Sequence, residues 1–174
     1  QVRPGSQQAN EAIAQTREQL TLARIEQYRQ QAEGFEQQEQ WQQAIDTYTA
    51  ALELDANLVF AQEGKDYSER RLQLDTLLQT NLDDPLRLSD AAAYQEALDV
   101  FRVASDLAQD LRAQGQESVG PRLQAQIQQT EAILQQMTQP REIRLLSDNA
   151  TQVTIYRVGE LGAFSQTSLM LTPG

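Results

Sequence analysis

The feature that most constrains the fold of this chain is a change of composition at Pro140. Residues 1–140 hold 22 acidic residues, 11 basic residues and 27 of the 29 glutamines, whereas residues 141–174 hold three acidic and three basic residues. The first segment is rich in Gln, Glu, Ala, Leu and Arg, which are good helix formers. The last 34 residues contain eight Val, Ile or Thr residues and three glycines, which is typical of short strands and turns. The sequence therefore predicts a mainly α protein with a small β unit (α+β), with a helical domain over 1–140 and a β domain over 141–174.

Apolar residues recur at three-to-four spacing through the first segment, which predicts a series of amphipathic helices. Ser6 is the expected N-cap of the opening helix, and Pro121 is typical of a first helical turn. The run Asp83-Asp84-Pro85 is expected to end the third helix, because proline cannot continue the helical hydrogen bonding. The predicted helices are an opening helix, 40–54, 58–82, a fourth from about 89 and, after a break at 115–120, a fifth from 121. Their short connections predict antiparallel neighbours.

The opening helix carries an apolar stripe that has two interpretations. Its members are Ile13, Leu20, Ile25, Tyr28, Ala32 and Phe35. A stripe at this spacing packs either against helices of the same chain or, as a coiled-coil seam, against a partner helix. We expect the first arrangement, and the second would produce a homodimer.

One residue pattern occurs twice within the helices. It runs small, aliphatic, acidic, aromatic, small, and its two copies are Ala44, Ile45, Asp46, Tyr48 and Ala51, then Ala97, Leu98, Asp99, Phe101 and Ala104. Small residues let a second helix approach closely, and the aromatic ring fills the space one turn further on. The repeated pattern therefore predicts packed helical hairpins.

These positions resemble the tetratricopeptide (TPR) family, whose helix pairs of about 34 residues follow such a pattern. Tyr28, Gln31, Ala32 and Phe35 fall at first-helix positions of the motif, and Ala44, Tyr48 and Ala51 at second-helix positions. The resemblance covers about residues 26–57, and a degenerate second copy covers about 90–112. It departs from the motif at Gln31, where an aliphatic residue is usual, and at Ala56, where the closing proline is expected.

The TPR resemblance implies antiparallel helical hairpins and a groove that binds a protein or peptide segment. By position in the motif, it implies that the partner-binding groove residues are Arg29, Glu33, Glu36 and Gln37.

The tail predicts three strands, at 143–147, 152–158 and 168–172, with turns at 148–150 and 159–162. With its Asp-Asn turn, its Val-Thr-Ile strand and its closing Leu-Thr-Pro-Gly, the stretch 143–174 resembles the opening part of a PEGA-type domain. Residues 158–162 stand in place of the motif that names that family. The resemblance implies a short antiparallel fragment of a β-sandwich, of the kind found in bacterial surface and envelope proteins.

Location is an expectation from that resemblance and from the start of the chain. No apolar run approaches the ~20 residues that cross a bilayer, and the first residue is Gln1 rather than Met. We therefore expect a periplasmic or extracytoplasmic protein that is anchored to the membrane through a missing segment upstream of Gln1.

The composition also excludes several kinds of chemistry. The chain has no Cys and no His, so it has no disulfides, no thiolate nucleophile, no imidazole base and no Cys/His zinc site. Its net charge of −11 opposes binding to nucleic acid, which requires clustered Lys and Arg. We predict no cofactor and no metal.

Three features remain that resemble reactive sites. The carboxylate pairs Glu36 with Glu39 and Asp83 with Asp84 are expected to be solvated helix faces, because acid–base chemistry needs two differently tuned carboxyl groups in a cleft. Lys65 is expected to be a surface lysine, and Gly159-x-x-Gly162 a turn, since no helix or basic residue of a phosphate site follows it.

The sequence thus favours a non-enzymatic protein–protein interaction or scaffold module of the bacterial cell envelope. One alternative is a homo-oligomeric structural protein that assembles through its long first helix or an open β edge. A second alternative is a carboxylate-dependent hydrolase, which requires a cleft with two Asp or Glu side chains about 5 to 9.5 Å apart.

Overall fold

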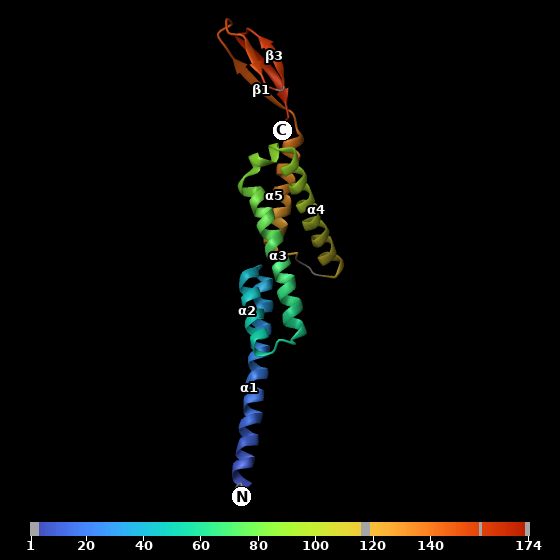
Figure 1. Ribbon diagram of the computed structural model, residues 1–174. Coiled ribbons are helices and arrows are strands. Elements are labelled where there is room, and N and C mark those ends of the chain that lie inside the picture. Colours follow the sequence, from blue (N-terminus) through green and yellow to red (C-terminus); the bar gives the residue numbers. More distant parts are fainter. Residues whose placement is uncertain (1–3, 116–118, 157, 173–174) are drawn as a thin grey trace. The chain divides into compact units, whose positions relative to one another are not determined.

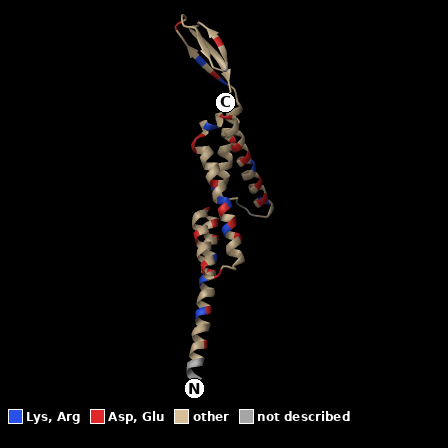
Figure 2. Ribbon diagram, in the orientation of Figure 1, with Lys and Arg blue, Asp and Glu red and all other residues tan. Residues whose placement is uncertain are grey.

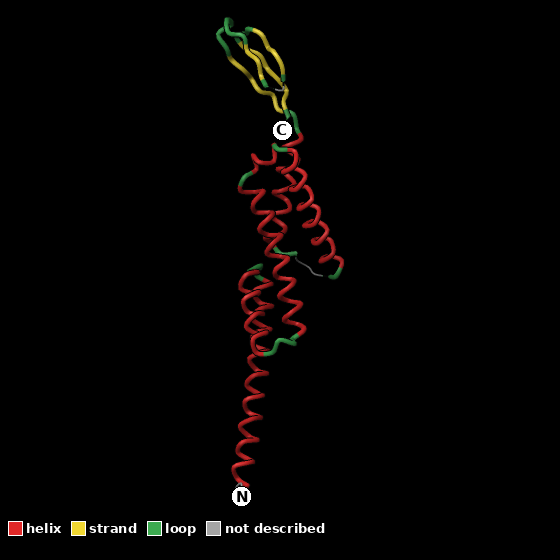
Figure 3. The backbone as a smooth tube through the Cα atoms, in the orientation of Figure 1, coloured by secondary structure: helices red, strands yellow, loops and turns green. Residues whose placement is uncertain are grey.

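The computed structural model describes residues 4–115, 119–156 and 158–172 (Figure 1). The elements in chain order are α1 (Pro4–Gln37), α2 (Trp41–Leu54), α3 (Val59–Asp83), a 3₁₀ helix η1 (Pro85–Ser89), α4 (Ala91–Ala113), α5 (Pro121–Thr138), β1 (Arg141–Leu146), β2 (Val153–Ile155), β3 (Gly159–Gly162) and β4 (Gln166–Leu171). Helices precede strands, as Figure 3 shows in red and yellow. The predicted class, mainly α with a small antiparallel β unit, is confirmed.

The chain forms two compact units, which we call the first and second units. The first comprises Gln1–Leu77 and Asp106–Ala125, and the second comprises Leu78–Ser105 and Gln126–Gly174. Helices α3, α4 and α5 each contribute residues to both units.

The core of the first unit is built from small residues and one aromatic ring. Its fully or nearly fully buried members are Ala32, Ala44, Tyr48, Ala51 and Ala61, with Tyr28, Phe35, Leu52, Leu58 and Phe60 packed around them. The Tyr48 and Phe60 rings meet edge to face with centroids 6.5 Å apart. Alanines let the helices approach closely, so this core confirms that Ala44, Tyr48 and Ala51 form an inward stripe.

Tyr48 lies directly over Gly64 of α3. A Cβ added to Gly64 would overlap the Tyr48 ring, whereas one added to Gly34 of α1 would meet nothing within 4 Å. Packing therefore requires glycine at position 64. It does so although a glycine within a helix is unfavourable by roughly 0.5–1 kcal/mol relative to alanine.

The second unit repeats this packing around the second copy of the pattern. Its core cluster is Leu88, Ala97 and Leu134, with Ala93, Tyr94, Leu98, Phe101, Ile133 and Met137 packed against it. Ala104 is also fully buried. Helix α4 begins two residues later than position 89, because Asp90 is its N-cap and accepts the N–H groups of Ala92 and Ala93 at 3.0 and 3.1 Å.

The expected inward stripe of α1 is wrong at its N-terminal end. Ile13 and Leu20 are 50% and 61% exposed, while Ile25 and Tyr28 are half-buried and Ala32 is buried. The reason is length: α1 has 34 residues and α2 has 14. These correspond to about 51 Å and about 21 Å of helix, so α2 covers only part of α1.

The β unit contains four strands in two antiparallel pairs, not the three strands that the sequence predicted. β1 pairs with β4, with Arg141 opposite Leu171, and β2 pairs with β3 across a register shift at Val153/Thr154. The expected turn at 159–162 is wrong, since this segment is strand β3. Gly159 and Gly162 adopt positive φ values of 128° and 73°, which glycine reaches without strain. These backbone conformations allow β3 to pair with β2 through an irregular register.

The expected turn at 148–150 is confirmed. The Asp148 carboxylate accepts the N–H groups of Ala150 and Thr151 at 2.9 and 2.7 Å, and Asn149 has a left-handed φ of 61°. These backbone hydrogen bonds, of which that from Thr151 has the largest effect, lower the pKa of Asp148 to about 2.

No residue described between 141 and 172 is fully buried. Within the described residues, no helix has the length and apolar character that a membrane span needs.

The Gly64 contact yields a matched pair of substitutions. Gly34→Ala should raise the free energy of unfolding by about 0.5–1 kcal/mol, the ordinary gain of alanine within a helix. Gly64→Ala should lower it by about 1–2 kcal/mol, because overpacking against Tyr48 outweighs that gain. Urea denaturation followed by far-ultraviolet circular dichroism measures both. A gain of stability in both variants would contradict the packing of Tyr48 on α3.

Candidate functional site

Glu39 occupies the turn between α1 and α2 in a conformation that usually belongs to glycine. Its φ is 55°, and the N–H groups of Glu39 and Gln40 donate to the carbonyls of Glu36 and Phe35 at 2.9 Å each. This is the Schellman arrangement that ends many helices, in which the left-handed residue is most often glycine. A glutamate in this position, with only 7% exposure, indicates that its side chain has a role of its own.

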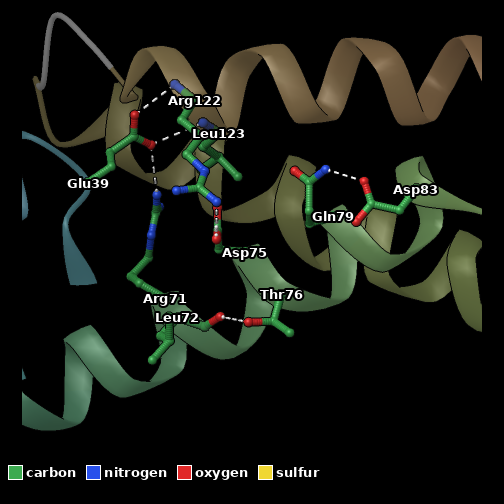
Figure 4. A network of polar contacts seen from close by, with 9 residues as sticks. All are labelled: Glu39, Arg71, Leu72, Asp75, Thr76, Gln79, Asp83, Arg122 and Leu123. Carbon is green, nitrogen blue, oxygen red and sulfur yellow. Dashed lines mark hydrogen bonds and ion pairs between the residues drawn. The ribbon is translucent and has the colours of Figure 1, made fainter. Parts of the chain in front are cut away.

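That role is to cap a helix more than 80 positions away in the sequence. The Arg122 and Leu123 N–H groups, at the start of α5, donate to Glu39 Oε2 and Oε1 at 2.7 and 3.0 Å (Figure 4). The carboxylate satisfies N–H groups that have no partner within the helix and complements the positive end of its dipole. Gly120 precedes them with φ 97°, and a Cβ there would overlap the Glu39 carboxylate.

Arg71 of α3 is buried against the same carboxylate. Its Nη2 lies 3.5 Å from Glu39 Oε1, both side chains are about 5% exposed, and its guanidinium lies 4.5 Å from the centroid of the Trp41 ring. One turn along α3, Asp75 Oδ2 lies 2.7 Å from Arg122 Nη2 (Figure 4). These two ion pairs join α3 to the turn after α1 and to the start of α5. Removing one partner of a buried pair usually costs about 3–5 kcal/mol.

One donor of this network remains unused. Arg71 Nη1 is hidden from solvent and has no hydrogen-bond partner among the described residues. Buried polar groups in proteins are nearly always paired, so an added acceptor would satisfy this guanidinium N–H. Beside it, burial raises the pKa of Tyr67, and the charge of the Arg71 guanidinium and a hydrogen bond between the two side chains oppose that rise.

Arg71 lines a cavity of about 700 Å³ in the first unit. The lining residues are Glu36, Gln37, Glu39, Trp41, Tyr67, Arg71, Leu111, Val119, Gly120 and Pro121. A second hollow of about 410 Å³ shares five of these residues and adds Glu33 and Gln114. We call the two together the Trp41 cavity. Its wall includes the Trp41 and Tyr67 rings, which meet edge to face at 5.9 Å.

Three of the four groove residues predicted from the TPR resemblance line this cavity. They are Glu33, Glu36 and Gln37, all on α1. Arg29 is not among the lining residues; its Nε lies 3.0 Å from Glu33 Oε1, and its guanidinium lies 5.5 Å from the Phe60 ring centroid.

Trp41, Tyr67 and Arg71 were not predicted from the sequence as residues of a site. One signal was present: the inward stripe of α3 runs Tyr67, Arg71, Leu74 and Leu78, so an arginine interrupts an apolar face. Charged residues are rarely buried unless they are paired, and such an interruption points to a buried ion pair.

Glu36 has an environment different from that of Glu39. Ser68 Oγ donates to Glu36 Oε1 at 3.0 Å. Burial raises the pKa of Glu36, and hydrogen bonds from Ser68 and Tyr48 oppose that rise. The expectation that Glu36 and Glu39 form a solvated helix face is therefore wrong, because the loop after α1 folds Glu39 inward and α3 covers Glu36. The same expectation holds for Asp83 and Asp84, which are exposed.

Two of the cavity carboxylates, Glu36 and Glu39, differ in their freedom to react. Both oxygens of Glu39 already accept hydrogen bonds from α5, and one also pairs with Arg71. Glu39 is therefore a structural anion, whereas Glu36 keeps part of its surface toward the cavity. Among the described residues, no group of three acidic side chains lies close enough together to hold a metal ion.

Comparison of the chain with models of known protein families, with curated proteins and with solved structures finds no match. The TPR-like and PEGA-like resemblances stay predictions from the residues that carry them.

The Glu39 cap yields a prediction with a close control. Gly120 and Gly115 both have positive φ, so Ala at either position should cost about 1–2 kcal/mol of backbone strain. Only Gly120 lies against the Glu39 carboxylate, while a Cβ at Gly115 would meet nothing within 4 Å. Gly120→Ala should therefore lower the free energy of unfolding by about 2–3 kcal/mol more than Gly115→Ala, because it displaces a charged hydrogen-bond acceptor. Equal losses in urea denaturation would show that the cap contributes little.

Glu36 yields a pH-dependent prediction. Because its pKa is raised in the folded state, the folded chain holds this proton more tightly, and the free energy of unfolding falls as pH rises through the carboxyl range. Because this loss grows as pH rises, Glu36→Gln should raise the urea midpoint at pH 7. The gain should shrink as pH falls below the ordinary glutamate pKa of about 4.3. Glu53→Gln, which neutralises an exposed carboxylate of α2, corrects for the change in net charge. A lower midpoint for Glu36→Gln at pH 7 would contradict the assignment.

Proposed function

We propose that this chain is a non-enzymatic docking module and that its Trp41 cavity binds a segment of a partner protein. The observation that carries the proposal is the buried Arg71 Nη1, which has no acceptor among the described residues and belongs to a residue of the cavity wall. An unsatisfied buried donor costs about 1–3 kcal/mol, and a ligand that supplies an acceptor recovers this free energy. Backbone carbonyls make every extended peptide a source of such acceptors.

The environment of the carboxylates favours binding over hydrolysis. A glycoside hydrolase needs one carboxyl group as acid and a second, unengaged one as base or nucleophile. Glu39 is committed to α5 and Arg71, which leaves Glu36 as the one cavity carboxylate that has neither a described cation nor a backbone N–H as partner. The proposed role is therefore recognition.

We place the module outside the bacterial cytoplasm, tethered to the envelope. This part of the proposal depends on the PEGA-like resemblance of residues 143–174. In this arrangement the β unit would serve attachment or assembly and the Trp41 cavity would hold the partner.

Filling the cavity tests the docking function. Gln37 is exposed on α1 and lines both hollows, so Gln37→Trp should occupy the space that a ligand needs. Peptides selected from a random phage-displayed library on the immobilised chain should bind Gln37→Trp at least about tenfold more weakly, as measured by fluorescence anisotropy. Gln31→Trp places the same ring at an exposed α1 position outside the cavity lining and should change the Kd little. Equal binding to wild type and Gln37→Trp would locate docking elsewhere.

Self-association is a second candidate, supported by the uncovered part of α1. Ile13 and Leu20, which are seven positions apart and therefore share one helix face, are exposed by 50% and 61%. Apolar residues exposed along a helix are suited to pairing with another helix. This hypothesis makes the chain a homodimer that is joined through α1.

The hypothesis predicts a dimer mass by size-exclusion chromatography with light scattering. Leu20→Glu should shift the chain to monomer, because a charge on the seam is desolvated without a partner. Gln19→Glu, the neighbouring substitution that adds the same charge, should leave the dimer intact. A wild-type chain that stays monomeric at high micromolar concentration would exclude this candidate.

A further inference from the structure

Resting on the proposed docking function, we infer that the occupant of the Trp41 cavity is a peptide segment with a basic side chain. The ammonium or guanidinium of a Lys or Arg residue pairs with Glu36, and a backbone carbonyl of the segment accepts a hydrogen bond from Arg71 Nη1.

The three described carboxylates of the cavity differ in their partners. Glu33 is paired with Arg29 at 3.0 Å, and Glu39 is paired with Arg71 and with the start of α5. Glu36 has only hydroxyl partners, Ser68 and Tyr48, and it takes part in no ion pair among the described residues. A half-buried carboxylate of this kind lacks a cation, and a basic ligand supplies one.

Arg71 supplies the donor for the carbonyl of the segment. Among the described residues that line the cavity, Arg71 is the one basic residue. Its charge is balanced by Glu39, and its Nη1, which has no partner within the described chain, can donate to an oxygen acceptor. An anionic ligand would meet Glu33 and Glu36 in the same cavity, so a neutral acceptor fits better. Nη1 is shielded from water in the free chain, so binding includes a side-chain adjustment of the sort that is common at interfaces.

The wall of the cavity suits the stem of a basic side chain. Tyr67 and Leu111 line both hollows and offer apolar surface. The methylene stem of Lys or Arg packs on such surface while its charged end reaches a carboxylate. A Lys or Arg residue therefore matches the whole site: its stem fits the apolar wall, its cation fits Glu36 and its carbonyl fits Arg71.

The charge of the chain supports the same partner at longer range. All of its net charge of −11 lies in residues 1–140, and acidic positions are distributed along the helices (Figure 2). A field of this sign attracts basic segments and accelerates their encounter.

The test uses the full chain and the indole N–H signal of Trp41, the only tryptophan, in two-dimensional ¹H–¹⁵N spectra. The probes are an acetylated and amidated pentapeptide with one central lysine among alanines, the same peptide with central norleucine, and n-butylammonium. The lysine peptide should shift the Trp41 signal with a Kd at least about tenfold lower than that of the norleucine peptide, which lacks the charge. It should also bind at least about tenfold more tightly than n-butylammonium, which lacks the carbonyl.

Two charge-matched variants locate the cation. Glu36→Gln should abolish the preference for lysine over norleucine, and Glu53→Gln, which removes one exposed charge outside the cavity, should preserve it. Equal binding of the lysine and norleucine peptides, or an unchanged preference in Glu36→Gln, would overturn the cation assignment and leave docking itself intact. Equal binding of n-butylammonium and the lysine peptide would overturn the carbonyl contact. If no probe shifts Trp41 and the library yields no peptide sensitive to Gln37→Trp, both the docking function and this inference are wrong.

Discussion

The first unit depends on one carboxylate. Glu39 ends the turn after α1, caps the first turn of α5 and neutralises the buried Arg71 of α3. The left-handed backbone at Glu39 is tolerated because the side chain that it positions satisfies three otherwise unpaired donors. Elements distant in the sequence are thereby held as the walls of one cavity. The Arg71 guanidinium also lies over the Trp41 ring, which adds a cation–π contact to the ion pair.

Three glutamates spaced three positions apart on α1 and in its terminal turn have three different roles. Glu33 forms an exposed pair with Arg29, worth little in free energy. Glu36 is half-buried with hydroxyl partners, and Glu39 is buried with a cation and a helix end. Their chemistry is identical, so their environments decide which one supports the fold and which one is free for a ligand. This separation is the physical basis for proposing a binding site rather than a reaction centre.

Two surfaces have no packing partner because the elements beside them are short. Helix α2 is too short to cover the N-terminal part of α1, and two pairs of short strands bury none of their described side chains completely. Both surfaces are suited to association, which is why self-association through α1 remains the second functional candidate.

Much of the secondary structure could be predicted from the sequence, because local propensity and periodicity act within a few residues. The inward alanines and Tyr48, the stop at Pro85 and the Asp148 turn all followed from spacing and turn chemistry. Strand β3 could not be predicted, because its glycines read locally as a turn and pair only when β2 lies beside them. The extent of the α1 stripe could not be predicted either, since the neighbouring helix sets how much of it is covered.

The site could be predicted only in part. The TPR-like positions led to Glu33, Glu36 and Gln37. The Glu39–Arg71 pair, however, joins residues 32 positions apart, and Glu39 lies more than 80 positions from the helix α5 that it caps. The sequence by itself determined which segments are helices and which faces are apolar. Only the tertiary structure decided which charges are buried together, because burial and pairing depend on the elements that fold against a residue, not on its neighbours along the chain.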